Sequence, residues 1–430
     1  MAIAQNPKPS YKLTELGEIP GEWEVVRLEN IADEIYYGIT AKATEENTGL
    51  KMLRTTDIKE YSANWNNLPF CEITEKRNNL DKYYLRKGDL IVARAGTVGI
   101  SVLVDKNFND TIFGSYLIKV KLKSKVFSKF AHCFFQSDIY WRHLLKAQGS
   151  TLKNINLPLL KSLILPLPSL PEQQKIAEIL SAVDRIIEGV QKAIEKTQKL
   201  KKGLMETLLT KGIQKGRFKI QDYQDTEIGR IPKEWEVVIL KEVVEINKEV
   251  RDPLREFPDR MFLYIDIDSV ENETGILKNT KTILGKEAPS RARRLIRYND
   301  VIMSTVRPYL KAFAIVPKKY DSQICSTGFA VLTCKEKIKP FYLLYTIFSK
   351  SVIDQCNKMM VGGQYPALNS SQVERIQIPL PSLPEQQKIA EILSAVDQKI
   401  ELLRTKKEKY EKIKKGLMED LLTGRRRVKV

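Results

Sequence analysis

The sequence predicts an α+β protein with two globular domains of mixed sheet and helix, separated by two long antiparallel coiled-coil helices and related by pseudo-two-fold symmetry. The main observation is a repeat. PLPSLPEQQKIAEILSAVD occurs at 166–184 and again at 379–397, 213 positions later, and KKGLME recurs at 201–206 and 414–419. The repeated segments carry apolar residues at helical spacing, whereas the segments before them carry short β-rich runs. The chain therefore alternates a variable block with a constant block, twice.

The repeat divides the chain into four expected segments. These are a first globular domain over 1–165, a first conserved helix over 166–212, a connector and second globular domain over 213–378, and a second conserved helix with a basic tail over 379–430. The two variable blocks also open alike, with TELGEIPGEWEVV at 14–26 and TEIGRIPKEWEVV at 226–238. They are otherwise almost unrelated, so two surfaces were kept alike while two others were allowed to differ.

The bulk composition narrows the class of protein. A net charge of +18 favours a polyanionic partner, nucleic acid first, although solvated lysine-rich helices would give the same excess. The five cysteines are scattered and the only histidines are His132 and His143, so the chain has few residues that could form a metal site or a histidine-based catalytic group. We expect buried reduced thiols, no metal and no cofactor. Without a long apolar run or an apolar leader at the N-terminus, we also expect a cytoplasmic protein.

The constant blocks predict two paired helices. Pro171 and Pro384 suit the first turn of a helix, and apolar residues then follow at alternating steps of four and three. The first turns of this seam hold Ile176, Leu180 and Val183 in one copy and Ile389, Leu393 and Val396 in the other. The seam weakens at Thr197 and Lys201, and at Lys407 and Lys414. Since the first helix leads to the second domain and the second helix starts there, facing seams must be antiparallel.

A buried seam does not explain why positions expected on the surface are the same in both copies. These positions are Gln173, Gln174, Lys175, Glu178 and Ser181, with Gln386 and Gln387 as the second pair of glutamines. A surface repeated about a two-fold axis indicates one type of partner that docks twice. Recent duplication is the alternative, but the dissimilar variable blocks argue against it.

The variable blocks predict small twisted sheets with polar loops. Strands are expected at Leu90–Ala93, Ile100–Val104, Val301–Met303 and Ala314–Val316. Arg and Gln side chains can read base edges, and Lys and other Arg residues hold phosphates. The candidate DNA contacts of the first block are Arg54, Thr55, Thr56, Lys59, Arg94, Thr97, Ser150 and Lys153. Those of the second block are Tyr264, Arg293, Arg294, Thr305, Arg307, Tyr309, Lys311, Gln364 and Tyr365.

The repeated PLPSLPEQQKIAEILSAVD, together with GDLIVARAGTVG at 88–99 and GEIPGEWEVVRLENI at 17–31, resembles the specificity subunit of Type I restriction–modification systems. The resemblance covers nearly the whole chain. It implies two target recognition domains, each reading one half of a bipartite DNA target, with helices that set the gap between the halves. It further implies that the helices dock two copies of a DNA adenine methyltransferase subunit and that a motor and endonuclease subunit joins for cleavage. Dissimilar recognition domains imply an asymmetric target.

The chain itself is expected to be non-catalytic. An amino-methyltransferase needs an Asn/Asp-Pro-Pro-aromatic loop, and the nearest string is Asn67-Leu68-Pro69-Phe70; a GxxxxGK[ST] phosphate loop is also missing. Two other classes stay open. An architectural or regulatory DNA-binding protein without methyltransferase partners predicts repeated helix surfaces that bind nothing, and a coiled-coil linker with protein-binding ends predicts no salt-dependent DNA affinity. The missing motifs oppose a self-contained methyltransferase-nuclease.

Overall fold

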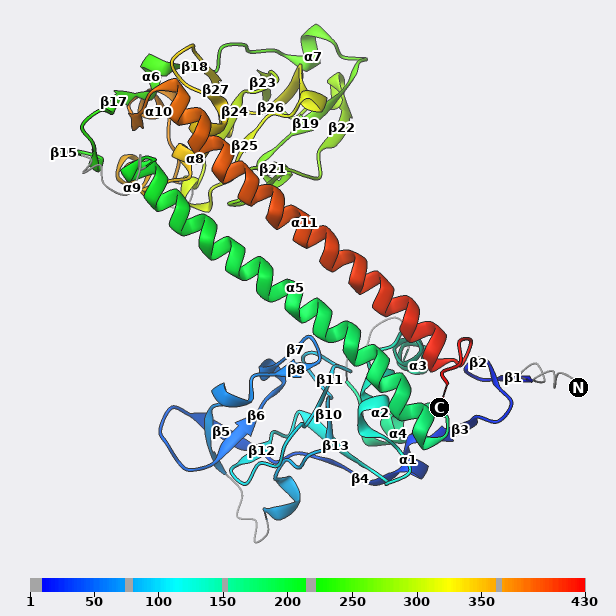
Figure 1. Ribbon diagram of the computed structural model, residues 1–430. Coiled ribbons are helices and arrows are strands. Elements are labelled where there is room, and N and C mark those ends of the chain that lie inside the picture. Colours follow the sequence, from blue (N-terminus) through cyan, green and yellow to red (C-terminus); the bar gives the residue numbers. More distant parts are fainter. Residues whose placement is uncertain (1–9, 74–79, 149–153, 214–221, 361–365, 430) are drawn as a thin grey trace, which may run out of the picture. The chain divides into compact units, whose positions relative to one another are not determined.

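The computed structural model describes residues 10–73, 80–148, 154–213, 222–360 and 366–429 (Figure 1). The chain divides into two compact units. Unit 1 comprises Met1–Gln191 and Thr405–Val430, and unit 2 comprises Lys192–Arg404. The division falls within the two long helices, α5 (Leu170–Lys211) and α11 (Leu383–Leu422). Each unit therefore contains one globular part and a segment of both helices.

The globular part of unit 1 has short strands and short helices. Its strands are β1 (Tyr11–Thr14), β2 (Gly17–Pro20), β3 (Glu24–Arg27), β4 (Ala32–Tyr37), β5 (Ala41–Thr44), β6 (Lys51–Leu53), β7 (Ile58–Lys59), β8 (Ser62–Ala63), β9 (Phe70–Ile73), β10 (Leu90–Ala93), β11 (Ser101–Leu103), β12 (Thr111–Phe113), β13 (Leu117–Leu122) and β14 (Ile164–Leu167). Its helices are α1 (Leu28–Ile31), η1 (Thr55–Asp57), η2 (Trp65–Asn67), η3 (Asp81–Tyr83), α2 (Ser128–Phe134), α3 (Asp138–Gln148) and α4 (Leu157–Ser162).

Two four-stranded sheets organise unit 1. One is antiparallel with the order β11-β10-β13-β4, and the other has the order β12-β6-β9-β5 with β6 parallel to β12. Alternate residues of β10 enter two different cores. Leu90 and Val92 pack with Phe130 and Leu180, whereas Ile91 joins the core of the second sheet. Burial on both faces explains why this strand is a continuous apolar run.

The globular part of unit 2 has a similar arrangement of strands and helices but a different sequence. Its strands are β15 (Tyr223–Thr226), β16 (Gly229–Pro232), β17 (Glu236–Ile239), β18 (Val244–Ile246), β19 (Met261–Ile265), β20 (Val270–Glu271), β21 (Ile276–Leu277), β22 (Lys281–Leu284), β23 (Ala292–Ile296), β24 (Val301–Ser304), β25 (Phe313–Ile315), β26 (Gln323–Ser326), β27 (Phe329–Cys334) and β28 (Gln377–Leu380). Its helices are α6 (Leu240–Val243), α7 (Pro253–Glu256), η4 (Ile267–Ser269), η5 (Gly285–Glu287), η6 (Pro308–Leu310), η7 (Lys318–Tyr320), α8 (Pro340–Ile347), α9 (Lys350–Met359) and α10 (Ser370–Glu374).

The sheet order of unit 2 matches that of unit 1 in the first sheet and partly in the second. The first sheet has the order β25-β24-β27-β18, which corresponds strand for strand to β11-β10-β13-β4. The second has the order β22-β19-β26-β23, with β19 parallel to β26 as β6 is to β12. The edge strands differ, because β5 lies beside β9 in unit 1 whereas β23 lies beside β26 in unit 2.

The structure confirms the α+β class and the four predicted strands to within one or two residues. Asn156 and Asn369, which are equivalent by the repeat, cap α4 and α10: their Oδ1 atoms accept hydrogen bonds at 2.9 Å from Leu159 N and Gln372 N. The glycine and serine positions just before these asparagines (149–150 and 362–363) lie outside the described residues.

The two long helices are antiparallel within each unit. In unit 1, Ile176 and Leu180 near the start of α5 share a core with Leu421 and Leu422 at the end of α11. In unit 2, Leu208 near the end of α5 shares a core with Ile389 and Leu393 near the start of α11. Both helix starts thus belong to a globular core as well as to the helix pair. Within the described part of the chain, no helix is long and apolar enough to cross a membrane.

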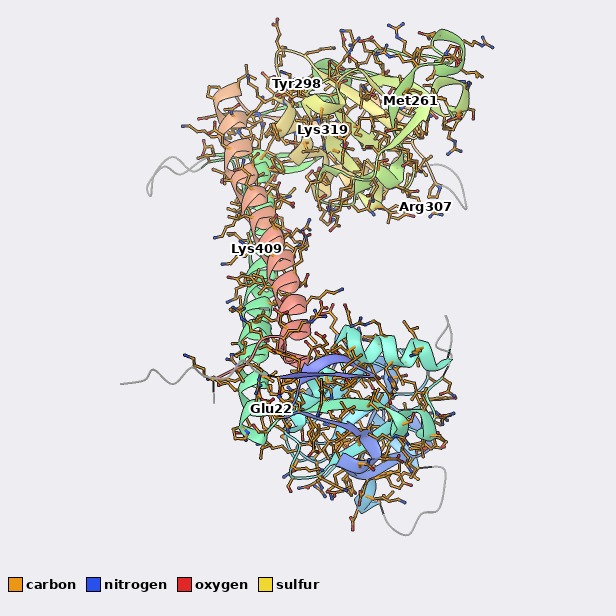
Figure 2. All side chains as sticks on the ribbon, turned by 90° about the vertical axis from the view of Figure 1, so that its right-hand side faces the viewer. Glu22, Met261, Tyr298, Arg307, Lys319 and Lys409 are labelled. Carbon is orange, nitrogen blue, oxygen red and sulfur yellow. The ribbon has the colours of Figure 1, made fainter. Side chains whose placement is uncertain are left out.

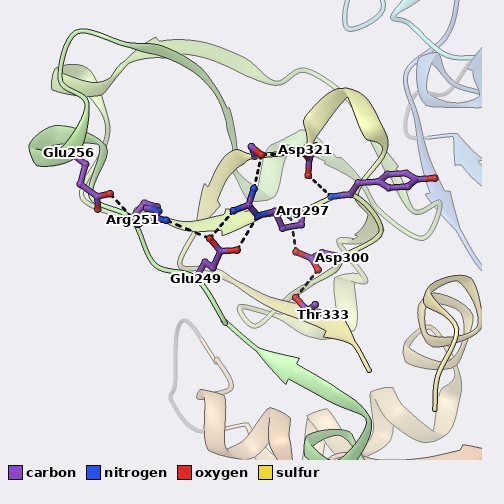
Figure 3. Close-up of polar contacts among 9 residues, drawn as sticks. Glu249, Arg251, Glu256, Arg297, Asp300, Asp321 and Thr333 are labelled. Atoms are coloured by element: carbon purple, nitrogen blue, oxygen red, sulfur yellow. Dashed lines mark hydrogen bonds and ion pairs between the residues drawn. The ribbon is translucent and has the colours of Figure 1, made fainter. Parts of the chain in front are cut away.

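One buried carboxylate occupies the same position in both units. Asp89 precedes β10 and is only 3% exposed, and Asp300 precedes β24 and is also 3% exposed. Lys119 pairs with Asp89 at 2.8 Å. Each carboxylate accepts a backbone hydrogen bond at 2.8 Å, Asp89 from Arg86 N and Asp300 from Arg297 N. In place of a lysine, Asp300 accepts from Thr333 Oγ1 at 2.7 Å (Figure 3).

Candidate nucleic-acid interface

Three loops of unit 1 meet at one edge of its sheets. Because β6 is parallel to β12, the residues that follow them lie side by side, and Gly114 N donates to Leu53 O at 3.0 Å. The segment after β10 joins them, since Arg94 N donates to Tyr116 O at 2.9 Å. A Cβ atom at Gly96 would lie 3.5 Å from Thr55 Oγ1. We call the segments 54–57, 94–99 and 114–116 the loop edge of unit 1.

The loop edge of unit 1 brings together five of the candidate residues: Arg54, Thr55, Thr56, Arg94 and Thr97. Thr56 and Thr97 are exposed, and the other three are half-buried. Arg94 has a fixed position, because its guanidinium lies 4.3 Å from the Tyr37 ring centroid and its Nε donates to Asn154 Oδ1 at 3.3 Å. Arg54 is held by Asp57 through two hydrogen bonds, Nη2 to Oδ1 at 2.9 Å and Nε to Oδ2 at 3.0 Å. These cations and hydroxyls suit phosphate and base-edge contacts.

The other three candidates of unit 1 are Lys59, which lies on β7, and Ser150 and Lys153. Lys59 is exposed on the β7–β8 hairpin, which follows η1 and whose Tyr61 hydroxyl accepts from Trp141 Nε1 at 2.9 Å. Ser150 and Lys153 lie outside the described residues.

The loop edge of unit 2 is built in the same way. We define it as the segments 266–269, 305–311 and 327–328. Thr305, directly after β24, donates its backbone N–H and its hydroxyl to Gly328 O at 2.8 and 3.0 Å. A Cβ atom at Gly328 would lie 3.1 Å from Ile267 Cδ1. The same three connections thus converge in both units.

The side chains at the loop edge of unit 2 differ from those of unit 1. Arg307 and Lys311 adopt left-handed backbone conformations, with φ of 47° and 55°, and flank the exposed Tyr309. Arg307 lies on a different part of the surface from Tyr298 (Figure 2). Where unit 1 has Arg54, unit 2 has Asp266, whose Oδ2 pairs with Lys281 Nζ at 2.7 Å.

Two predicted DNA contacts of unit 2 are wrong because their side chains are internal. Tyr264 is 6% exposed and packs with Phe262, Ala292 and Ile324, since it lies in the middle of the sheet on β19. Thr305 is 7% exposed, and its hydroxyl is used within the loop edge. Neither side chain is available to a base.

The other candidates of unit 2 lie on β23 or are not described. Arg293 is half-buried and pairs with Asp252 at 3.2 Å. Arg294 is also half-buried; burial lowers the pKa of its guanidinium, and its Nη1 has no hydrogen-bond partner among the described residues. Gln364 and Tyr365 lie outside the described residues.

The glutamines predicted as docking residues separate into two kinds. Gln173 and Gln386 are 1% and 0% exposed, so the expectation that they are on the surface is wrong. Each joins its helix start to the globular core: Gln173 Oε1 accepts from Phe127 N at 2.8 Å, and Gln386 Oε1 accepts from Lys339 N at 2.9 Å. Ser181 is also buried, at 5% exposure. Gln174 and Gln387 are exposed, and so are Lys175 and Glu178.

The apolar seam residues are buried or nearly so, as predicted. Ile176, Leu180, Val183, Ile389 and Leu393 are each at most 9% exposed, and Val396 is half-buried. The first two and the corresponding Ile389 and Leu393 lie in globular cores as well as in the helix pair. Substitutions there would therefore disturb the fold of a unit and not only the helix pairing.

A repeated tryptophan–glutamate contact ties each globular part to a helix start. Trp23 Nε1 donates to Glu172 Oε2 at 3.0 Å, and the equivalent Trp235 Nε1 donates to Glu385 Oε2 at 3.1 Å. Arg427 also binds Glu172 at 2.8 Å, whereas Ile213 N donates to Glu385 at 3.0 Å. The repeated segments GEWEVV and KEWEVV contain the two tryptophans, but only the structure shows that their partners are Glu172 and Glu385.

His132 is half-buried and Cys71 is buried. Burial lowers the pKa of His132 to about 4 and raises the pKa of Cys71 to about 11. The Asn67–Phe70 string leads from η2 into β9. In the described segments, no group of three or more metal-binding side chains comes together.

Sequence reasoning missed Ser115 and Tyr116 at the loop edge of unit 1. Tyr116 is 64% exposed, and both residues come after β12 and Gly114. The signal was a polar turn after the apolar run Thr111–Phe113, but its position beside Arg94 depends on strand pairing.

A family model described as Type I restriction modification DNA specificity domain matches residues 20–196 and 232–412. The putative type I restriction enzyme MjaX specificity subunit of Methanocaldococcus jannaschii is 31% identical over 439 residues, covering 98% of this chain and 97% of that protein. The type I restriction enzyme MjaVIII specificity subunit of the same organism is 30% identical over 429 residues, covering 96% and 94%.

Two solved structures share the fold. A chain from work on complex assembly and conformational transition of the type I R-M system has a TM-score of 0.58 at 16% identity, covering 94% of this chain and 99% of that chain. The Type I restriction-modification system S subunit from M. genitalium has a TM-score of 0.52 at 18% identity, covering 96% and 98%.

Proposed function

The chain belongs to the family of Type I restriction modification DNA specificity proteins, and from that premise we propose that it chooses the DNA target of a Type I restriction–modification complex. Each loop edge binds one half of a bipartite target. The observation that carries this proposal is the construction of the same edge twice, on the same central strand order, with different side chains. The chain itself supplies recognition, and a partner supplies catalysis.

The chemistry of the two edges supports an asymmetric target. Unit 1 presents Arg54 and Thr55 after β6, whereas unit 2 presents Asp266 and Ile267 after β19. Two edges with different donors and acceptors select different bases. The net charge of +18 adds phosphate affinity that is independent of sequence and sensitive to salt.

The repeated exposed residues near the helix starts are the proposed docking surfaces for two copies of a DNA adenine methyltransferase subunit. Gln174 and Gln387 are exposed, as are Leu170 and Leu383, at 37% and 38%. Identical exposed apolar and amide groups at equivalent positions suit one partner type that binds twice. A motor and endonuclease subunit joins the same complex in the cytoplasm when DNA is cleaved.

The first experiment is methylation mapping by long-read sequencing in cells that express this chain together with a DNA adenine methyltransferase subunit of a Type I system. We expect N6-methyladenine in a gapped, asymmetric motif that disappears when this gene is deleted. If no methylated motif depended on the gene, the partnership with a methyltransferase would be lost. Salt-dependent binding of the purified chain to duplex DNA would then leave an architectural DNA-binding protein, and no binding would leave a protein-binding linker.

Single-residue variants test the two edges separately. Arg94→Ala should relax base preference only in the half-target read by unit 1, and Arg307→Ala only in the other half. Loss of one bidentate base contact costs about 1–3 kcal/mol of discrimination. Lys409→Ala is the matched control, because Lys409 is an exposed cation on α11 outside both edges (Figure 2). Equal relaxation of both halves by either arginine variant would contradict the assignment.

A block exchange tests modularity. Replacing residues 25–166 with the corresponding block of another family member should change one half of the motif and leave the other half and the gap unchanged. A simultaneous change in both halves would contradict independent recognition by the two units.

A further inference from the structure

Two ion pairs join α5 to α11, one in each unit. In unit 1, Lys414 Nζ lies 2.7 Å from Asp184 Oδ1. In unit 2, Lys201 Nζ lies 2.6 Å from Asp397 Oδ1. The repeat makes the two aspartates equivalent and the two lysines equivalent. We call these contacts the Asp–Lys pairs.

The Asp–Lys pairs are compatible with one and the same alignment of the helices. Asp184 and Lys201 are 17 positions apart on α5, and Asp397 and Lys414 are 17 positions apart on α11. Since the helices are antiparallel, an alignment that forms one pair also permits the other. A slip of seven residues would separate each pair by about 10 Å along the axis, so both would break together.

The lysines occupy positions where the apolar seam is interrupted. Lys201 and Lys414 have side chains that are only 13% and 22% exposed. A polar residue in a helix seam specifies the register, because a slipped register leaves it buried without a partner. The interruption at these lysines is thus a source of specificity: apolar residues would tolerate many alignments equally well.

Each Asp–Lys pair also contacts the globular part of its own unit. Lys414 Nζ donates to Gln136 Oε1 at 2.9 Å, just after α2. Tyr345 in α8 donates its hydroxyl to Asp397 Oδ2 at 2.8 Å, and its ring lies 5.6 Å from Lys201 Nζ. The pairs therefore join three elements in each unit, both long helices and a helix or turn of the globular part.

We propose that Asp184, Lys201, Asp397 and Lys414 are specificity-determining residues that fix a single register of α5 against α11, and that this register restricts the protein to one gap length between the half-targets. The second part rests on the proposed function. The first part concerns the chain alone.

The register is tested by charge exchange in the full-length chain. Asp184→Lys places two lysines together and should lower the urea midpoint of unfolding. Adding Lys414→Asp should restore most of that loss. The matched control adds Lys407→Asp instead, because Lys407 lies seven positions earlier on α11 and also interrupts the seam. Rescue by Lys414→Asp alone supports the register, whereas equal rescue by both, or by neither, overturns it.

The gap is tested with the methyltransferase complex on duplexes that contain the mapped half-targets at the native spacing and at spacings one base pair shorter and longer. Asp184→Lys should lower the preference for the native spacing by at least tenfold while base preference within each half stays unchanged. The double variant Asp184→Lys with Lys414→Asp should regain it. Unchanged spacing preference in a variant with a lowered unfolding midpoint would overturn the link between register and gap.

The two readouts separate failure of this inference from failure of the proposed function. If wild-type protein gave no methylated motif, the proposed function would fail. The unfolding series would still decide the register, since it needs neither DNA nor a partner.

Discussion

Unit 1 and unit 2 stabilise the same buried carboxylate in different ways. Asp89 is neutralised by Lys119, whose side chain is 4% exposed and also donates to Tyr84 O at 3.0 Å. Asp300 has a hydroxyl and a backbone N–H as partners, and its burial raises the pKa of its carboxyl group. The two units thus share a fold without sharing the electrostatics of its core.

A surface network surrounds Asp300 in unit 2 (Figure 3). Arg297 binds Glu249 through Nε at 3.0 Å and Nη2 at 2.9 Å, and its Nη1 donates to Ser322 Oγ at 2.8 Å. The guanidinium compensates the half-buried carboxylate of Glu249, and the hydrogen bonds to Asp300 come from neutral donors. Arg297 is close enough for its charge to lower the pKa of Asp300, but among the described residues no lysine or arginine side chain forms an ion pair with Asp300 as Lys119 does with Asp89.

The units instead agree where a globular part meets a helix. The tryptophan–glutamate contact, the buried glutamine and the Asp–Lys pair all recur in both units. Identity is thus concentrated in contacts that orient each globular part on the helices. Variation is concentrated in the sheets and loop edges, and this distribution suits a protein that changes its target while keeping its assembly.

The largest expected difference between the units comes from the buried carboxylates. Asp89→Asn leaves Lys119 buried without a counter-charge and should destabilise unit 1 by about 3–5 kcal/mol. Asp300→Asn keeps both hydrogen bonds if its amide donates to Thr333, and should change unit 2 by no more than about 1 kcal/mol. Hydrogen exchange of β10 and β24 measures each unit separately. Equal destabilisation would mean that Asp300 has an ionic role that the structure does not show.

Exchanging glycine with a larger residue should have a large effect in the loop after β10 and a small effect in the loop after β24. Gly99 has φ of +86°, and an added Cβ would lie 2.8 Å from the Trp141 ring, so Gly99→Ala should cost about 2–4 kcal/mol. Arg307→Gly removes the Cβ from a left-handed position and should leave stability within about 1 kcal/mol of wild type. Thermal unfolding followed by circular dichroism tests both variants. A large loss in Arg307→Gly would assign that side chain to folding as well as to recognition.

The repeated glutamates provide a smaller contrast. Glu172→Gln breaks the ion pair with Arg427 and should cost about 1.5–3 kcal/mol. Glu385→Gln keeps one acceptor oxygen and loses one hydrogen bond from an uncharged donor, either Trp235 Nε1 or Ile213 N, and should cost about 1 kcal/mol. Urea unfolding of both single variants measures the difference, with Arg427→Gln as the control that should reproduce most of the Glu172 effect. Identical losses would show that the Arg427 contact adds nothing to the tryptophan contact.

The smallest expected effect is the pH dependence that Asp300 gives to the stability of unit 2. Because folding raises the pKa of Asp300, the folded state holds this proton more tightly than the unfolded state. The contribution of Asp300 to stability is therefore greatest below the unfolded pKa of about 4 and declines as pH rises through the raised folded value. Asp300→Asn should gain stability relative to wild type over that rise, as measured by unfolding midpoints across a pH series. A gain that is constant with pH would contradict the assignment.

Much of the architecture followed from local pattern. The repeat, the helix starts at Pro171 and Pro384, and strands such as Leu90–Ala93 were readable because each depends on neighbours within a few residues. The sequence did not show which polar helix residues are buried against a globular part. Gln173 and Gln386 looked like surface residues because the periodicity of a helix cannot reveal a globular core packed against its polar side.

The sequence predicted which kinds of residue the candidate interface contains, but it predicted their positions only in part. Arg54, Arg94 and Thr97 do converge, but Tyr264 and Thr305 point inward and Tyr116 was missed. These outcomes depend on which strands pair and whether they are parallel, and strand pairing joins residues far apart in the chain.

The sequence by itself determined that there are two variable blocks and two constant helices. Repeated segments and heptad spacing can be recognised from neighbouring residues alone, without knowledge of any contact between distant parts of the chain. Only the tertiary structure decided that Asp184 meets Lys414, that Lys201 meets Asp397, and that three separate loops form each edge. Such contacts are selected by the packing of whole elements against one another, and the free energy of that packing is a property of many residues together.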